Sequence, residues 1–250
     1  MKTSEIIATQ IKHINSNFKE YFKMVFPLFI IIAVTYHPIY DELIEGDNIP
    51  IIIILMIFSL YGIFYTLRYI VNVHRYVILN DISNYFSIIK KFKVTFFYTI
   101  YIFIIFLLVG TIVVSIIYLK PLIFSDEDIG AYILIIIQSI AIAIVFSFFA
   151  LILPNAAVGE KTKLKEILMQ GKKFRLTIFF LVFSVYAPFL IINEGLFFEA
   201  LFSDSTPSFS ASLAYSVINA IIYCYLITLF AGCLSRIYML SKETTSKNNI

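Results

Sequence analysis

The residues that most often perform chemistry in proteins are few in this sequence and widely spaced. Its only histidines, His13, His37 and His74, have no second histidine or cysteine three or four residues away that would suggest a metal site on one helix. Cys224 and Cys233 lie nine residues apart in one apolar segment. On a helix this spacing puts them about half a turn out of phase, so they can neither bridge one another nor share a metal. We interpret both as packing residues.

Catalytic motifs are also missing from the sequence. It contains no G-x-S-x-G, no H-E-x-x-H and no glycine-rich phosphate loop. The polar residues inside its apolar segments are neutral: Gln138, Ser139, Ser184, Asn219 and Thr228. A proton-coupled transporter usually places a carboxylate at such a depth. We therefore expect no catalytic residue, no metal and no cofactor, and interpret Gln138 and Asn219 as interhelical hydrogen-bond partners, with pore lining as the alternative.

Two basic clusters are the remaining candidates for a functional site. The segment KKFKVTFF at 90–97 recurs as KKFRLTIF at 172–179, and a weaker copy, EYFKMVF, lies at 20–26. Each copy ends a short amphipathic segment and begins a long apolar one. Near an anionic membrane surface each basic residue contributes about 1 kcal/mol of attraction. The candidate anionic-lipid contacts are Lys90, Lys91, Lys93, Lys172, Lys173 and Arg175; the alternative is that these charges only set topology.

Composition indicates what surrounds these clusters. Sixty per cent of the residues are hydrophobic and 14% are charged, which is typical of an integral membrane protein. Apolar segments at 24–40, 50–67, 94–119, 129–155, 176–193 and 211–240 predict six transmembrane helices in an all-α fold. Amphipathic patterns at 3–22, 82–92 and 164–174 predict helices on the membrane surface. For the first of them, packing on the bundle is the alternative. Asp81 and Thr162 are candidate N-caps of the second and third of these.

The order of these elements predicts three copies of one unit, a surface helix followed by a transmembrane hairpin. The units are 1–78, 79–155 and 160–240, and together they form one membrane domain, 1–240. A polar tail at 241–250 is expected to be disordered.

The distribution of charge predicts the orientation. With six spans, Lys120 is the only one of the 19 Lys and Arg residues on the side of the hairpin tips, and most of the Asp and Glu residues lie there. By the positive-inside rule both termini are cytoplasmic. We therefore expect a multi-pass protein of the bacterial cytoplasmic (inner) membrane.

Two segments resemble a known family. The segment VHRYVILND at 73–81 is similar to a W/H-R-x-x-L-L-G/N-E/D signature, and LPNAAVGE at 153–160 is similar to a second motif that precedes a short helix and a new span. Both resemble the membrane domain associated with bacterial glycerophosphodiester phosphodiesterases and its stand-alone six-span relatives. Asn80 stands where a small Gly is usual, and the phosphodiesterase catalytic domain is absent. The resemblance therefore implies a membrane-domain relative and transfers no catalytic residue.

Three functions are compatible with these features. The first is a non-enzymatic membrane module that supports an envelope or lipid-related process, with membrane lipids and an unidentified membrane protein as partners. The second is a small permease or channel subunit, and the third is an intramembrane enzyme, which the missing acid–base pair disfavours. Nucleic-acid binding is not expected, because the sequence contains no soluble module to organise it.

Overall fold

A computed structural model describes residues 2–35, 49–81, 92–123, 127–160, 163–193 and 209–247, and these residues form helices and short connections without a strand. In chain order the helices are α1 (Thr3–Ser16), α2 (Phe18–Thr35), α4 (Ile49–Leu79), α5 (Phe92–Ile123), α6 (Glu127–Phe149), α7 (Ile152–Val158), α8 (Leu164–Gly171), α9 (Arg175–Asn193) and α11 (Phe209–Lys247). A 3-10 turn, η2 (Lys172–Phe174), joins α8 to α9.

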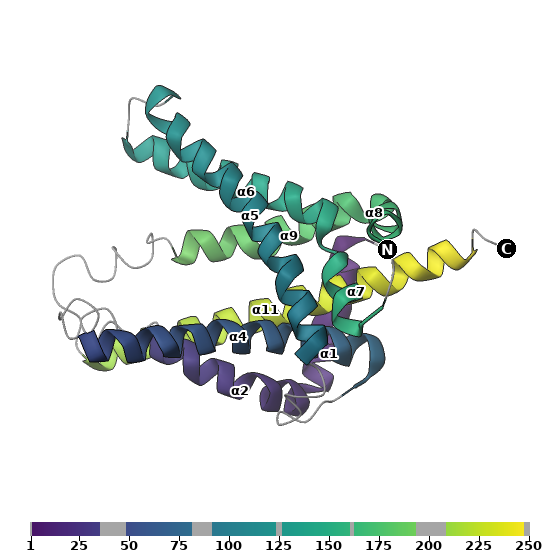
Figure 1. Ribbon diagram of the computed structural model, residues 1–250, viewed down its shortest axis with the longest axis horizontal. Coiled ribbons are helices and arrows are strands. Elements are labelled where there is room, and N and C mark those ends of the chain that lie inside the picture. Colours follow the sequence, from purple (N-terminus) through teal and green to yellow (C-terminus); the bar gives the residue numbers. More distant parts are fainter. Residues whose placement is uncertain are drawn as a thin grey trace.

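The helices form two groups that meet at one end of the molecule. In Figure 1, α2, α4 and α11 run side by side, whereas α5 and α6 slant away from them as a pair. Helix α9 packs mainly on α6. The short helices α1, α7 and α8 lie at the end where the two groups meet, and the C-terminal part of α11 extends past them (Figure 1).

The described residues contain three helices that are long and apolar enough to cross a membrane: Ile52–Leu79, Phe92–Ile112 and Leu213–Thr244. Large apolar side chains on them face outward, among them Ile54 at 64% exposure and Leu60 at 66%. Such surfaces are stable against lipid and unfavourable in water. The protein is therefore an all-helical membrane protein, as the composition predicts. The predicted spans at 24–40 and 176–193 correspond to α2 and α9, which are not among these three helices; residues 36–40 lie outside the described part.

The predicted fourth span is broken. Helix α6 ends at Phe149, and α7 continues from Ile152 at an angle of 48°. The predicted span extends to residue 155, but the helix breaks between Phe149 and Ile152, about one turn earlier. A proline cannot donate to the carbonyl four residues before it, and its ring clashes with that carbonyl, here that of Ala150. Pro154 is instead accommodated in the first turn of α7, where its missing N–H is not needed.

The single amphipathic helix predicted over residues 3–22 is also divided. Asn17 ends α1 because its backbone N–H and its side-chain amide both donate to the carbonyl of His13. Helix α2 then begins at Phe18, so the weak third copy of the basic motif, at 20–26, lies inside α2 and not at a junction.

Helix α1 is fastened to α11 by a buried polar contact. The side chain of Gln10 is fully buried; its Oε1 accepts a hydrogen bond from Arg236 Nε at 2.8 Å, and its Nε2 donates to the Tyr21 hydroxyl at 3.3 Å. The amide reaches Arg236 because it lies over Gly232, where an added Cβ would come 2.0 Å from Gln10 Nε2. Burial and the nearby charge of Arg236 lower the pKa of His13, one turn further along α1, so its ring stays neutral. Of the two alternatives for this segment, packing on the bundle is observed for one face of α1.

The ends of α4 and α11 differ from what the sequence predicts or from the resembled motif. Asn80 follows α4 with a φ of 51°, the left-handed conformation that favours Gly or Asn just beyond a helix. Asn80 thus has the backbone conformation that Gly also favours at this position. Helix α11 extends through Lys247, and Ser241 is buried. The prediction that the tail is disordered from residue 241 is therefore wrong for residues 241–247, which are helical.

We predict that Gly232→Ala weakens the attachment of α1. The methyl group displaces the buried Gln10 amide, and overpacking of this kind costs about 1–3 kcal/mol. The double variant Gln10→Ala/Gly232→Ala should recover part of the loss, because the methyl group then occupies space that the amide has left. Thermal unfolding in detergent and hydrogen exchange of the α1 amides measure both effects.

Gly110→Ala is the matched control, since an added Cβ at Gly110 on α5 meets nothing within 4 Å. Equal destabilisation by the Gly110 and Gly232 variants would contradict a specific contact between α1 and α11.

Candidate functional site

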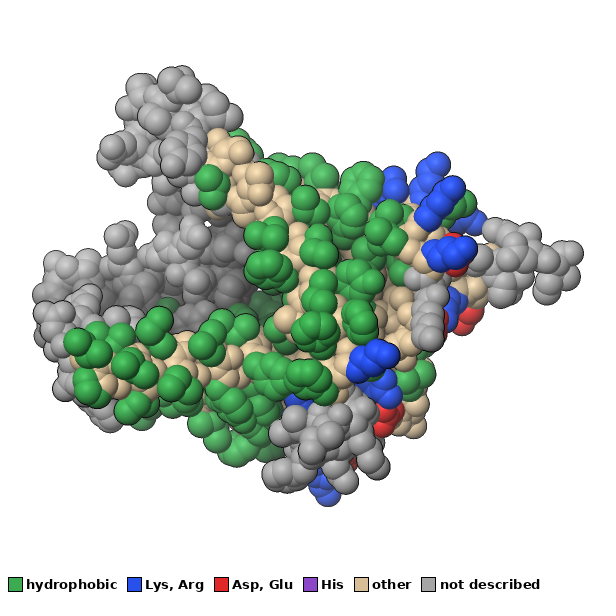
Figure 2. Space-filling view, viewed as in Figure 1, with side chains coloured by type: hydrophobic (Ala, Val, Ile, Leu, Met, Phe, Trp, Pro, Cys, Tyr) green, Lys and Arg blue, Asp and Glu red, His purple; other side chains and the backbone are tan. Residues whose placement is uncertain are grey.

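The described members of the two basic clusters lie at or next to the starts of α5 and α9. Lys172 and Lys173 form the 3-10 turn η2, Arg175 is the first residue of α9, and Lys93 is the second residue of α5. Figure 2 shows Lys and Arg side chains gathered at the end where α1, α7 and α8 lie, while apolar side chains cover the visible face beyond it. Lys90 and Lys91 lie outside the described residues.

The structure brings two of these residues together with a third that the sequence analysis missed. A surface cavity of about 470 Å³ lies along α8 and the start of α9. Its described lining consists of Leu164, Lys165, Leu168, Met169, Lys172 and Arg175. Lys173 and Lys93 do not line it. Lys165 could have been found from its position seven residues before Lys172, because residues seven apart share one face of a helix.

Arg175 is held in place by an aromatic ring. Its guanidinium carbon lies 4.2 Å from the centre of the Phe148 ring, a cation–π contact between α9 and α6. Its Nε is buried and has no hydrogen-bond partner among the described residues. A buried donor without an acceptor costs about 1–3 kcal/mol. An oxygen of an anionic group bound in the cavity would satisfy part of that requirement.

The cations are surrounded by exposed apolar side chains. Leu164 is 50% exposed, Met169 is 66% exposed and Leu176, directly after Arg175, is 68% exposed. Positive charges beside exposed apolar carbon match the chemistry of a phospholipid, which has an anionic phosphate next to acyl chains. Three cations beside exposed apolar carbon can bind and orient an anionic amphiphile.

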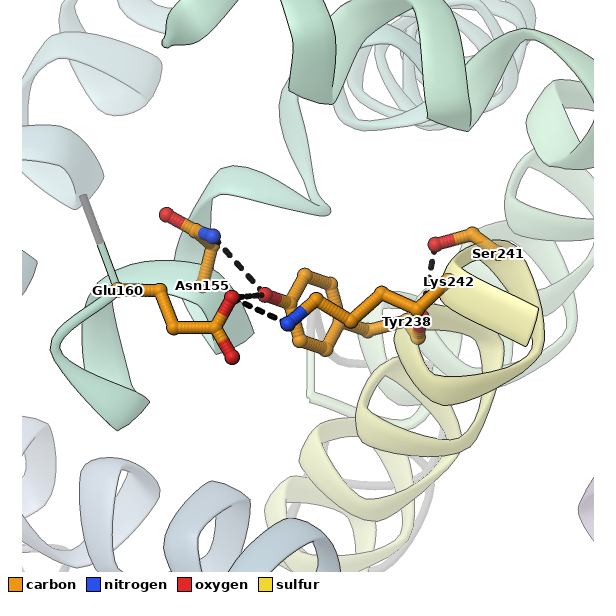
Figure 3. A network of polar contacts seen from close by, with 5 residues as sticks. All are labelled: Asn155, Glu160, Tyr238, Ser241 and Lys242. Atoms are coloured by element: carbon orange, nitrogen blue, oxygen red, sulfur yellow. Dashed lines mark hydrogen bonds and ion pairs between the residues drawn. The ribbon is translucent and has the colours of Figure 1, made fainter. Parts of the chain in front are cut away.

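A second polar cluster lies close to this end of the bundle, between α7 and α11. Figure 3 shows the Tyr238 hydroxyl between two partners: it accepts a hydrogen bond from Asn155 Nδ2 and donates one to Glu160 Oε2, both at 2.9 Å. The same carboxylate oxygen pairs with Lys242. Asn155 and Tyr238 are both buried, so the bond between them is shielded from water, whereas the side chains of Glu160 and Lys242 are partly exposed. These contacts hold α7 and the residue that follows it, Glu160, against α11.

The two motif segments of the family resemblance meet in the same region. Arg75, at the end of α4, forms an ion pair with Asp81 at 2.7 Å and also donates to the backbone carbonyl of Ala157 in α7 at 3.2 Å. The predicted N-cap residue Asp81 thus binds Arg75; the helix it was expected to cap, like Thr162, lies outside the described residues. These motif residues hold helices together and carry no arrangement typical of a catalytic site.

The other residues singled out for chemistry are placed as follows. Cys224 and Cys233 are free thiols, both buried. The amide nitrogen of Asn219 is buried with no hydrogen-bond partner among the described residues, and the role of Asn219 as an interhelical hydrogen-bond partner stays a prediction. Thr228 does bond across helices, to the Tyr69 hydroxyl of α4. Within the described part of the chain, no group of three or more His, Cys, Asp and Glu residues could hold a metal ion.

We predict that Tyr238→Phe destabilises the protein by about 1–3 kcal/mol, because it leaves the buried Asn155 amide without its acceptor. Hydrogen exchange should accelerate in α7 before it does in α5. Tyr225→Phe on the same helix is the control, since Tyr225 is 41% exposed on the outer face. An unchanged melting temperature in detergent for Tyr238→Phe would contradict a stabilising role for this cluster.

Comparison with known proteins finds no family model, no curated protein and no solved structure that matches this chain.

Proposed function

We propose that this protein is a non-catalytic membrane module that binds anionic phospholipid at the junction of α8 and α9, in support of an envelope or lipid-related process. The observation that carries the proposal is the surface cavity in which Lys165, Lys172 and Arg175 converge beside exposed Leu164 and Met169. A soluble anion would need the charges alone. A phospholipid uses both the charges and the apolar carbon next to them.

The proposed topology has six spans, arranged as three hairpins, with both termini in the cytoplasm of a bacterium. Helix α1 and the C-terminal part of α11 lie at the same end of the molecule, which supports an even number of crossings (Figure 1). The clustered Lys and Arg side chains lie at that end too (Figure 2). Under the positive-inside rule this end faces the cytoplasm, where the inner leaflet is rich in anionic lipid.

Kinship with the membrane domain of glycerophosphodiester phosphodiesterases remains part of the proposal. The bond from Arg75 to the carbonyl of Ala157 supports it, because the two segments that carry the resemblance then form one structural unit. A permease or channel is the second candidate from the sequence. It would require a polar path through the bundle, and the described lining of the internal cavity between α4, α5 and α11 is almost entirely apolar.

The topology predicts which positions react with a membrane-impermeant thiol reagent in whole cells. In a background that carries Cys224→Ala and Cys233→Ala, Asp47→Cys and Asp128→Cys should be labelled from outside. Lys247→Cys, at the end of α11, should react only after the cells are opened. Labelling of residue 247 in intact cells would mean an odd number of spans or the opposite orientation.

The lipid site predicts a difference between two triple variants of equal charge. Lys165→Gln/Lys172→Gln/Arg175→Gln removes the cations that line the cavity, at a loss of about 3 kcal/mol or on the order of a hundredfold in affinity for phosphatidylglycerol. Lys93→Gln/Lys163→Gln/Lys173→Gln removes three basic residues that do not line it and should leave most of the binding intact. Native mass spectrometry of both proteins, purified from vesicles that contain phosphatidylglycerol and phosphatidylethanolamine, counts the bound lipid.

Both variants must first insert with the topology described above. Equal loss of phosphatidylglycerol from the two would show that total charge, and not this cavity, attracts the lipid. Equal retention by the two would indicate that the basic residues only set topology.

A further inference from the structure

A second cavity lies inside the bundle, away from the basic residues. It has a volume of about 360 Å³ and is bounded by α4, α5, α6, α9 and α11, with Leu153 of α7 at one end. This volume is within the range of small-molecule pockets. Its described lining consists mostly of Ile, Leu, Val and Phe side chains, and none of these lining residues is Lys, Arg, Asp or Glu. A ligand in this cavity is therefore predominantly apolar and carries no charge.

The lining of the cavity covers a similar length on three of the helices. On α4 its lining extends from Ile63 to His74, on α5 from Tyr98 to Val109, and on α11 from Tyr223 to Leu234. Each stretch covers about 16 Å of helix at the usual rise per residue. One leaflet of a bilayer has about half of the roughly 30 Å hydrocarbon thickness. The cavity thus has the length of one lipid chain.

Four polar side chains line the cavity, Thr66, His74, Tyr98 and Tyr223, and two of them, His74 and Tyr98, lie together at the end nearest the basic side of the molecule. His74 is fully buried on α4, directly before Arg75, and its Nδ1 lies 2.8 Å from Ser235 Oγ. The Tyr98 hydroxyl lies 3.4 Å from His74 Nε2. A lipid chain in the cavity would therefore have its polar end here, close to the membrane surface, and its methyl end near mid-bilayer.

The hydrogen bonds around His74 determine which atoms can bind a ligand. Ser235 donates its own proton to the carbonyl of Ala231 at 2.9 Å, so its oxygen accepts from the Nδ1–H of His74. A buried imidazole with no carboxylate beside it among the described residues is neutral, because an unpaired charge there would be costly. Its Nε2 is then an acceptor, and the Tyr98 hydroxyl is a donor. Their separation of 3.4 Å is long for a direct hydrogen bond.

We propose that this cavity binds a single-chain lipid with a free hydroxyl, a long-chain alcohol. A hydroxyl both donates and accepts, so it can give its proton to His74 Nε2 while it accepts from Tyr98. A carboxylate or an ester only accepts, and a carboxylate would also bring an uncompensated charge into an apolar cavity. The site is separate from the phospholipid site on α8, which is built from cations.

The absence of tryptophan from the sequence allows a direct test. Phe230→Trp places the only tryptophan at the cavity, where chains brominated at one end quench its fluorescence. Two probes are compared in detergent at equal mole fraction: 12-bromododecan-1-ol, and its methyl ether, which accepts a hydrogen bond but cannot donate one. We expect saturable quenching, with affinity for the alcohol roughly tenfold above that for the ether, the effect of a well-placed hydrogen bond in a buried site.

Tyr98→Phe in the Phe230→Trp background removes the donor from which both probes accept, so it should lower the affinity for both and leave the alcohol roughly tenfold ahead of the ether, because only the alcohol donates to His74 Nε2. Phe103→Trp, on the outer face of α5 at 61% exposure, reports contact with the surrounding detergent and should be quenched without saturation and equally by both probes. The variant Lys165→Gln/Lys172→Gln/Arg175→Gln should keep its affinity for the alcohol, which separates this site from the phospholipid site.

A cavity-filling pair provides a test that does not depend on the introduced tryptophan. Ile227→Phe narrows the cavity, whereas Ile221→Phe adds the same volume on the outer face of α11, where Ile221 is 55% exposed. Mass spectrometry should detect bound dodecan-1-ol on the parent protein and the Ile221 variant and severalfold less on the Ile227 variant. Unsaturable quenching at position 230, equal affinity for alcohol and ether, or equal occupancy of the two Phe variants would each overturn the proposal.

Discussion

The fold depends on a row of polar side chains along one helix, α11. Within lipid, helices gain little by burying apolar surface against one another, so interhelical hydrogen bonds and close packing decide which helices associate. Thr228 and Ser235 of α11 bond to Tyr69 and His74 of α4. Further along, Arg236 holds α1 through Gln10, and Tyr238 and Lys242 hold the α7 region through Asn155 and Glu160. One helix thus selects the positions of three others.

This row also explains why the molecule is compact at one end and divided at the other. The polar contacts of α11 run from Thr228 to Lys242, in its C-terminal half, and the short helices gather there (Figure 1). Beyond them α5 and α6 diverge from α4 and α11 (Figure 1). The internal cavity is lined by all four of these helices and by α9, and most of its described lining is apolar.

The two proposed ligand sites follow the same division. At the basic end, the chain presents cations beside exposed apolar carbon, which suits a charged headgroup at the membrane surface. Inside the bundle the described lining is mostly apolar and has no charged residue, and His74 and Tyr98 at one end provide an acceptor and a donor, which suits a neutral lipid. Because charge is costly to bury and inexpensive at the interface, depth in the membrane selects between these two classes of ligand.

The all-helical membrane character could be predicted from the sequence because it depends on composition and on the length of apolar segments, which are local properties. The starts of α5 and α9, at Phe92 and Arg175, follow from the same local pattern. The break at Ala150 could also have been predicted from the sequence, because a single proline one turn later, Pro154, causes it. The pairing of Gln10 with Arg236, and of Asn155 with Tyr238, could not, because residues 226 and 83 positions apart have no pattern in common along the chain. Lys165 lines the surface cavity and Lys173 does not. The reason is the 3-10 turn η2 between α8 and α9, which determines the face of α8 that lies beside Arg175. The sequence by itself determined which segments prefer lipid; only the tertiary structure decided which polar atoms meet, because such contacts depend on the packing of helices that are distant in the chain.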